Sequence, residues 1–236
     1  IFSPDEQAAL QVEPQAAIIG LTDDQLGAES IEIPATVSSA GNEYKVVALG
    51  ERAATQARNA ADPNADASIK DMHLLGNGAG AAGISAKNPA LEKLLLPDSL
   101  TYIDVDALAV FQSLKTIEVN VGNPVFAGHM GTLLMTNDFE QSVQDAEGVT
   151  VAYIPSAMRN VELPEHATGI FSEAAPYAKG VAGFHVPEAN THLTSTADLL
   201  LRSQEDDSLA VALRAAAAGT ATVIPETATL NDQALP

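Results

Sequence analysis

The sequence predicts a repeat solenoid in which short parallel strands stack along one face. The first observation is the stretch 91–113, whose apolar residues follow neither a helical period nor a strict alternation. Leu94 and Leu96 stand two positions apart, so both point to one face of a short strand, and Pro97 ends that strand. The resulting unit is apolar inside but too small to close a core, and therefore needs neighbours of the same kind.

The second observation is that this spacing recurs at 23-residue intervals. The equivalent apolar residues of four registers are Leu91, Leu94, Leu96 and Ile103; Leu114, Ile117, Val119 and Phe126; Met158, Val161, Leu163 and Ile170; and Val181, Phe184, Val186 and Leu193. Weaker copies stand upstream at Ile69, Met72 and Leu74, and at Ile33, Val37, Val47, Leu49 and Ala53. A fixed period of this length is typical of stacked repeats.

Composition supports thin stacked repeats and excludes several classes of protein. The chain has 236 residues, 46% of them hydrophobic but only 4% aromatic, so a sizeable core has to be built from Leu, Ile, Val and Ala. Its formal charge of −20 disfavours a nucleic-acid partner through long-range repulsion. The absence of cysteine excludes a disulfide framework and thiolate chemistry.

The chain lacks any run close to the ~18 apolar residues that cross a bilayer, so we expect no membrane span. It begins at Ile1 rather than Met, so we expect a processed or truncated piece, with any signal peptide or cell-wall anchor outside it.

Three regions are expected along the chain. Residues 1–61 form an N-terminal lead-in and capping region, with a short helix after Ser3 and an Ala-rich helix over 51–61. Residues 62–203 form the solenoid. Residues 204–236 form a C-terminal helix, over 208–218, and a tail.

An inserted hairpin is expected near residues 131–154. Residues 137–157 are left over when two 23-residue units are taken from the 67 residues that separate Leu91 from Met158. The turn-prone residues 145–148 precede Val149, which begins an alternating, strand-like segment.

The motif LxxLxLPxxLxxIxxxA, with SIEIPATV and YKVVALGERAA upstream, resembles the BspA-type bacterial leucine-rich repeat family over residues 18–203. The stretch GNPVFAGHMGTLLMTNDF also resembles the family's recurrent interruption, a short hairpin that stands off the solenoid. Where the family has Ala-Phe, this chain has Ala53-Ala54, Ala107-Leu108 and Ala174-Ala175.

The resemblance implies a leucine-rich-repeat-like fold whose other side is irregular and turn-rich. It also implies a secreted or cell-surface location and a non-catalytic module for adhesion, whose partner is an extracellular protein or glycan. A purely structural spacer, which holds another domain away from a cell wall, is a further alternative.

A different function is suggested by the glycine motif GxGxxG at Gly78–Gly83, which follows a strand-like segment and precedes Asp98 by about twenty residues. An α/β nucleotide-binding enzyme domain uses such glycines at the start of a helix, where backbone amides meet the pyrophosphate. Pro89 breaks that helix within two turns, which favours an outer turn of the repeat instead.

The sequence predicts no metal, cofactor or catalytic residue. Asp62, Asn64 and Asp66 imitate the start of a calcium loop, but Ala67 and His73 stand where that loop needs Gly and Glu. The histidines lack zinc-binding spacing, and no GxSxG elbow is present.

The predicted repeats do offer a binding surface. On each strand, the residues that flank the buried position point outward and should align with those of the next strand at about 4.8 Å. We call these residues the strand-face ladder: Lys93, Leu95, Thr116, Glu118, Asn160, Glu162, Gly183 and His185.

Overall fold

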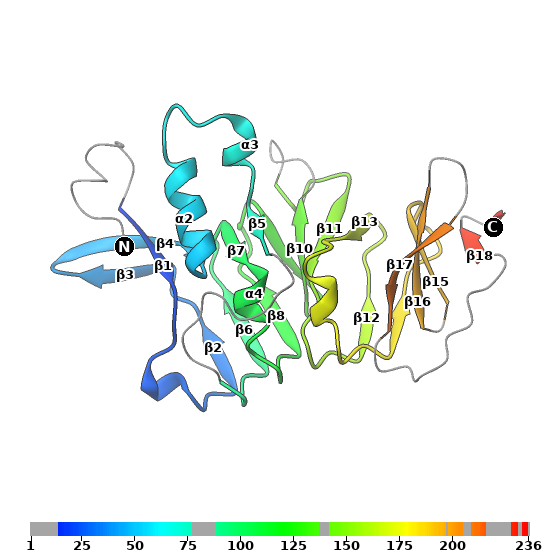
Figure 1. Ribbon diagram of the computed structural model, residues 1–236, viewed down its shortest axis with the longest axis horizontal. Coiled ribbons are helices and arrows are strands. Elements are labelled where there is room, and N and C mark those ends of the chain that lie inside the picture. The colour runs from blue at the N-terminus through cyan, green and yellow to red at the C-terminus, as the bar shows by residue number, and fades with distance from the viewer. Residues whose placement is uncertain are drawn as a thin grey trace.

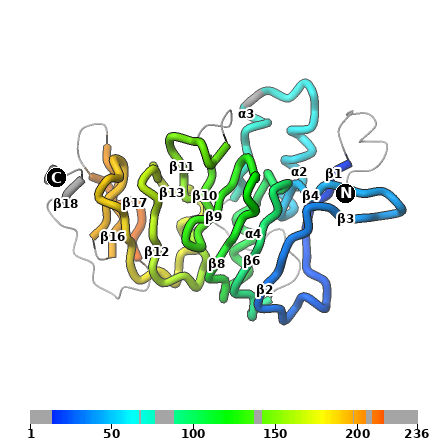
Figure 2. The backbone as a smooth tube through the Cα atoms, turned by 180° about the vertical axis from the view of Figure 1, so that it is seen from behind, coloured from blue at the N-terminus to red at the C-terminus, as the bar shows by residue number. Residues whose placement is uncertain are grey.

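The computed structural model describes residues 14–76, 88–136, 142–196, 198–204, 209–215, 228–230 and 233–235. The elements follow one another along the long axis of the molecule, from β1 and β4 at one end to the last strands at the other (Figure 1). Figure 2 shows the same progression from behind. The described part of the chain is therefore an elongated stack whose first and last strands lie at opposite ends.

Two parallel sheets carry the predicted register. β2 (Ser30–Glu32), β6 (Lys93–Leu96) and β8 (Thr116–Val119) form one of them, and Leu94 lies between Ile31 and Ile117. In the other, β12 (Asn160–Glu162) pairs with β14 (Gly183–His185), which places Val161 opposite Phe184. The 23-residue offset is confirmed between β6 and β8 and between β12 and β14, and each repeat of the chain is called a coil below.

A five-stranded sheet forms the other side of the N-terminal half. Its strand order is β1 (Gln15–Ile18), β4 (Asn42–Leu49), β7 (Tyr102–Asp104) and β5 (Leu74–Leu75), and β3 (Thr36–Ser39) joins β4 as an antiparallel hairpin partner. The expectation of an irregular, turn-rich side is therefore wrong here. Ile103 of β7 pairs with Leu49 on one side and with Leu74 on the other. This parallel pairing satisfies the backbone N–H and C=O groups while the three side chains face the core.

The weak copy predicted at Ile69, Met72 and Leu74 does not add a coil to the first sheet. Ile69 lies in the short helix α3 (Ala67–Lys70), and Met72 is 50% exposed. β2 lies beside β6 instead, because Ile31 supplies an inward apolar side chain in register with Leu94.

The remaining helices cover or cap the N-terminal half. α2 (Glu51–Ala60) confirms the predicted Ala-rich helix, and it packs Ala53 and Ala57 against Val47 and Ala48 of β4. The short elements are the 3₁₀ helix η1 (Asp23–Gln25), α4 (Val105–Leu108) and the 3₁₀ helix η2 (Ala175–Tyr177). The helix predicted after Ser3 lies outside the described residues.

The insertion is antiparallel, as predicted, but it begins earlier in the chain. β9 (Phe126–His129) and β10 (Thr132–Thr136) form a hairpin, β10 also pairs with β11 (Val149–Tyr153), and β13 (Ala167–Ile170) completes the sheet. Met130 and Gly131 are the two turn residues, and both have positive φ. Two such residues match the twist of a tight hairpin.

The C-terminal region is a sheet rather than a helix over its described part. β15 (Leu193–Thr196), β16 (Leu199–Ser203) and β17 (Leu209–Arg214) are antiparallel, and β18 (Ala228–Leu230) pairs with β19 (Gln233–Leu235). The helix predicted over 208–218 is therefore wrong at Leu209–Arg214. β16 offers a strand edge, and pairing with it outweighs the helix propensity of the alanines.

Two buried asparagines tie successive coils together in the same way. Each side-chain amide donates to two carbonyls of the preceding coil, and each side-chain oxygen accepts from two N–H groups that follow it. The partners of Asn123 are Pro97 O (3.0 Å), Leu100 O (2.7 Å), Val125 N (3.0 Å) and Phe126 N (2.8 Å). Those of Asn190 are Pro164 O (3.2 Å), Ala167 O (2.9 Å), His192 N (2.8 Å) and Leu193 N (2.7 Å).

His73 connects the loop before β5 to β7 of the five-stranded sheet. Its ring stacks on Tyr102 with 5.0 Å between ring centroids, and its Nδ1 lies 3.0 Å from Thr101 O. Burial lowers the pKa of His73 from its ordinary value of 6.5, although the Thr101 carbonyl and Asp71 act in the opposite direction. The folded protein therefore favours the neutral ring.

Substitution Asn123→Ala should lower the free energy of unfolding by about 3 kcal/mol or more, because two carbonyls and two N–H groups lose their partner inside the protein. Urea unfolding of the variant and of wild type measures this. Asn120→Ala, at an exposed position three residues earlier, is the matched control and should change stability little. Equal stability of both variants would contradict the bridging role.

Stability should fall as the pH drops below about 6.5, because the unfolded state then binds a proton at His73 that the folded state resists. Melting temperatures measured from about pH 7.5 to about pH 5.5 should fall less for His73→Phe than for wild type. Met72→Ala, which changes an exposed neighbour without a titrating group, should keep the wild-type pH dependence. If the melting temperature of His73→Phe fell with pH as steeply as that of wild type, His73 would not contribute to the pH dependence of stability.

Candidate functional site

Half of the strand-face ladder lies on the outer side of β6 and β8. Lys93 is the register partner of Thr116, and Leu95 is the register partner of Glu118. The ammonium of Lys93 also reaches diagonally to Glu118, with 2.8 Å between Nζ and Oε1. The side chains of this ion pair are 43% and 50% exposed, so the pair lies in solvent. The structure thus brings these four predicted residues together on one accessible surface.

The other half lies on β12 and β14. Asn160 pairs with Gly183, and Glu162 pairs with His185. Asn160, Glu162 and His185 are exposed, and Gly183 is half-buried. The register within this half is the predicted one.

The two halves do not join into one continuous row, which corrects the expected ladder. The tip of the β9–β10 hairpin lies against β8, and the N–H of Ile117 donates to Gly131 O over 2.9 Å. A Cβ on Gly128 would lie 3.2 Å from Ile117 O, and one on Gly131 would lie 3.4 Å from Thr116 Cα. The two glycines therefore let the hairpin approach the backbone of β8 closely, and the hairpin takes the place expected for the next strand.

The hairpin tip also reaches the coil that carries the second half of the ladder, because a Cβ on Gly131 would lie 2.9 Å from Met158 Cε and Met158 stands two residues before β12. Burial lowers the pKa of His129, His166 lowers it further, and Glu162 of β12 acts in the opposite direction. The hairpin tip thus forms the centre of the outer surface.

A surface depression lies where β8 meets the hairpin. We call it the hairpin depression; its volume is about 460 Å³, and it is lined by Leu95, Thr116, Ile117, Glu118, Val119, Asn120, Val121, Gly128, Met130 and Gly131. Val121 is 94% exposed and Met130 is 66% exposed. Met130 also has a φ of 48°, a left-handed conformation in which a residue other than Gly, Asn or Asp is uncommon. Two apolar side chains are thus held in solvent beside Glu118.

Sequence reasoning missed Val121 and Met130 as surface residues. The predicted hairpin lies near residues 131–154, and the stretch that resembles the family's interruption runs from Gly122 to Pro155; neither prediction marks an exposed turn at Met130. The available signal was Met130-Gly131 between the strand-like segments FAGH and TLLMT, since a two-residue connection ending in Gly is a common hairpin turn.

A partly buried ionic cluster joins α2, α4 and η2. Arg52 donates through Nε and Nη2 to both carboxylate oxygens of Asp104, each over 2.8 Å, and Nη2 also donates to Asp106. The hydroxyl of Tyr177 donates to Asp106 Oδ1 over 2.5 Å. The hydrogen bond to Asp104 raises the pKa of Arg52 above its ordinary value, so the guanidinium remains charged. The cluster fastens α2, α4 and η2 to one another.

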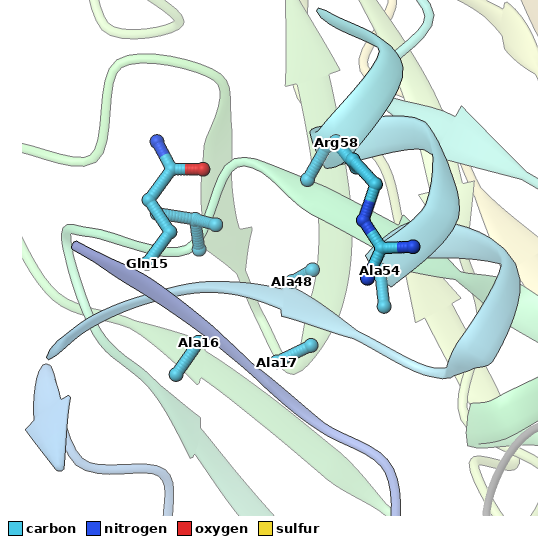
Figure 3. Close-up of a pocket in the computed structure, with 8 residues that line it drawn as sticks. Gln15, Ala16, Ala17, Ala48, Ala54 and Arg58 are labelled. Carbon is cyan, nitrogen blue, oxygen red and sulfur yellow. The ribbon is translucent and has the colours of Figure 1, made fainter. Parts of the chain in front are cut away.

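A small cavity lies between β1 and α2, where Gln15 and Arg58 approach from the two elements over a floor of alanines (Figure 3). The Oε1 atom of Gln15 is buried and lacks a hydrogen-bond partner within the described residues. The cavity volume is about 30 Å³, enough for one water but not for an organic ligand. A water here would satisfy Gln15, and the cavity is structural.

The described ranges hold no group of three or more His, Cys, Asp or Glu side chains arranged to bind a metal ion. Gly78–Gly83, the glycines of the nucleotide alternative, lie outside those ranges. Among the described helices, none has the length and apolar character needed to cross a bilayer.

Neither a protein-family model nor a curated protein matches this chain. Solved structures similar to it include a leucine-rich repeat protein from Eubacterium ventriosum, with 17% identity, a TM-score of 0.34, and coverage of 50% of this chain and 28% of that one. A second is the pneumococcal vaccine antigen PcpA, with 14% identity, a TM-score of 0.32, and coverage of 73% and 58%.

A third is a leucine-rich cell-surface protein from Faecalibacterium prausnitzii, with 13% identity, a TM-score of 0.29, and coverage of 90% of this chain and 58% of that one. In all three cases the match spans less than two thirds of the solved protein. TM-scores this low do not establish a common fold, so the repeat architecture rests on the 23-residue register of the chain itself.

Proposed function

We propose that this chain is a non-catalytic, leucine-rich-repeat-like solenoid that is secreted or displayed on a cell surface. Its function is recognition of an extracellular protein. The fold part of the proposal is supported by the 23-residue register of the parallel strands. The location is supported by the resemblance of the repeat motif to a bacterial surface family.

The observation that carries the function is the pair of exposed apolar side chains at the hairpin depression. Val121 and Met130 border it, and together with Leu95 they offer an apolar surface to solvent. Apolar residues gathered beside ordered backbone mark contact surfaces more often than isolated ones do. Met is also common at binding surfaces, because its flexible thioether adapts to different partners.

The groups around the depression suit binding rather than catalysis. Its single carboxylate is Glu118, which is already paired with Lys93, and the other polar side chains are those of Thr116 and Asn120. General acid–base or nucleophilic chemistry needs a base and a nucleophile within hydrogen-bond reach of each other. This lining instead combines exposed apolar side chains with a few polar ones, a mixture that is usual in protein interfaces.

Charge favours a basic partner. The chain has a formal charge of −20, and Glu118 and Glu162 lie on the outer surface on either side of the hairpin tip. A cationic protein surface would be attracted at long range, while the apolar residues would stabilise the contact once formed. The association should therefore weaken with salt.

Val121→Asp and Met130→Asp should each weaken binding about tenfold or more, because each places a charge in the apolar part of the contact. We would measure association of the intact chain with immobilised extracellular matrix proteins, and with glycans in parallel, by biolayer interferometry. Val211→Asp is the matched control, because Val211 is also exposed but lies on β17.

Binding that both hairpin substitutions leave unchanged would contradict the proposed surface. Binding to glycans alone would replace the protein partner with a carbohydrate. A wild-type chain that binds neither class would favour the structural spacer.

A further inference from the structure

A second, separate cavity lies inside the N-terminal end of the stack. Its volume is about 230 Å³, and it is lined by Ile18, Gly20, Leu21, Thr22, Gln25, Ile31, Glu32, Ile33, Pro34, Leu49, Leu94 and Phe111. The innermost of these side chains, Leu49, Leu94 and Phe111, are each 2% exposed. The cavity is therefore a space beside the core that the described residues leave unfilled.

The walls come from elements that are far apart in sequence. Ile18 ends β1, Ile31 belongs to β2, Leu49 ends β4 and Leu94 belongs to β6. All four strands are held in register by backbone pairing. The walls are thus fixed by the two sheets and cannot close over the space without breaking those sheets.

The roof is the segment between β1 and β2, which is closed on itself by hydrogen bonds. The N–H and the hydroxyl of Thr22 both donate to Oε1 of Gln25 over 3.1 Å, around the 3₁₀ helix η1. The buried side chain of Asn88 donates to Gln25 O and to Ala28 O, each over 2.8 Å. These bonds fix the conformation of the segment that covers the space.

The size and chemistry of the cavity define what fits it. Protein interiors contain few voids larger than one water, and an apolar cavity of about 150 Å³ lined by Leu, Ile and Phe binds benzene. The cavity here is larger, and its inner wall is made of the same residue types. Glu32 at its rim and the formal charge of −20 disfavour an anionic ligand.

We infer that this cavity is a binding site for a small uncharged organic molecule, with an apolar body the size of one substituted aromatic ring or a short alkyl chain. The ligand would lie against Leu49, Leu94 and Phe111 and would reach solvent past Thr22 and Gln25. This site is independent of the hairpin depression, because the two share only the β6 strand.

The test is saturation-transfer NMR of benzyl alcohol with the intact chain. Benzoate, an anion of similar size, is the comparison probe. Wild type should bind benzyl alcohol with a Kd of about 1 mM or tighter. Benzoate should bind about tenfold or more weakly.

Ile18→Phe should fill the cavity and weaken benzyl alcohol binding about tenfold, while the melting temperature stays the same or rises. Ile19→Phe is the matched control, because the next residue along the chain is 50% exposed and does not line the cavity. It should leave binding unchanged. Leu21→Phe, also in the lining, is the second filling variant if Ile18→Phe does not fold.

Three outcomes would overturn the inference. One is absence of benzyl alcohol binding by wild type, which would mean that the space is already filled by protein. Another is equal binding by a folded filling variant and by Ile19→Phe. The last is equal binding of benzoate, which would show that the probe does not occupy an apolar, acid-rimmed site.

Discussion

The rest of the structure depends on one contact between inward side chains on adjacent parallel strands. The three side chains are those of Ile31, Leu94 and Ile117. A single coil presents one or two such residues and cannot enclose them, so each coil is stable only where another lies against it. Backbone pairing alone would leave the coils free to slip, and a slip of one residue would turn the apolar side chains outward. The bridging asparagines add a second restraint, because Asn123 and Asn190 each bind two carbonyls of the coil before them. Burial and these hydrogen bonds together fix the 23-residue register.

The outer surface follows from an interruption of the same register. The β9–β10 hairpin lies where the next strand would pair with β8, and Gly128 and Gly131 allow the close approach. Because Gly131 of the hairpin turn packs against β8, its neighbour Met130 is held in solvent beside Val121. A regular stack would have presented a uniform row of side chains. The hairpin instead divides the strand-face ladder and provides the apolar centre of the proposed recognition surface.

The register of the parallel strands could be predicted from the sequence because inward apolar residues recur at a fixed distance, and this signal survives substitution of Leu by Ile, Val or Phe. The Ala-rich helix α2 was predictable from propensity. The same propensity misled at Leu209–Arg214, where Leu209, Val211 and Leu213 alternate as in a strand and an edge of β16 is available.

Which segment lies beside β6 was not predictable, because Ile31 is distant in sequence and the spacing at Ile69 imitates a coil. The exposed Val121 and Met130 and the cavity below η1 depend on how the elements meet, and no local pattern records that.

The register itself can be measured with paired cysteines, since the chain contains none of its own. The double substitution Leu95→Cys and Glu118→Cys joins two register partners, whose Cα separation of about 5 Å suits a disulfide. Leu95→Cys with Asn120→Cys keeps the same faces but shifts the pairing by two residues, to about 8 Å, which is too far to bridge. Mass spectrometry after mild oxidation should find an intramolecular disulfide in the first variant and free thiols in the second. A disulfide in the second variant with free thiols in the first would contradict the 23-residue register, and with it the stacked repeats on which the proposed surface rests.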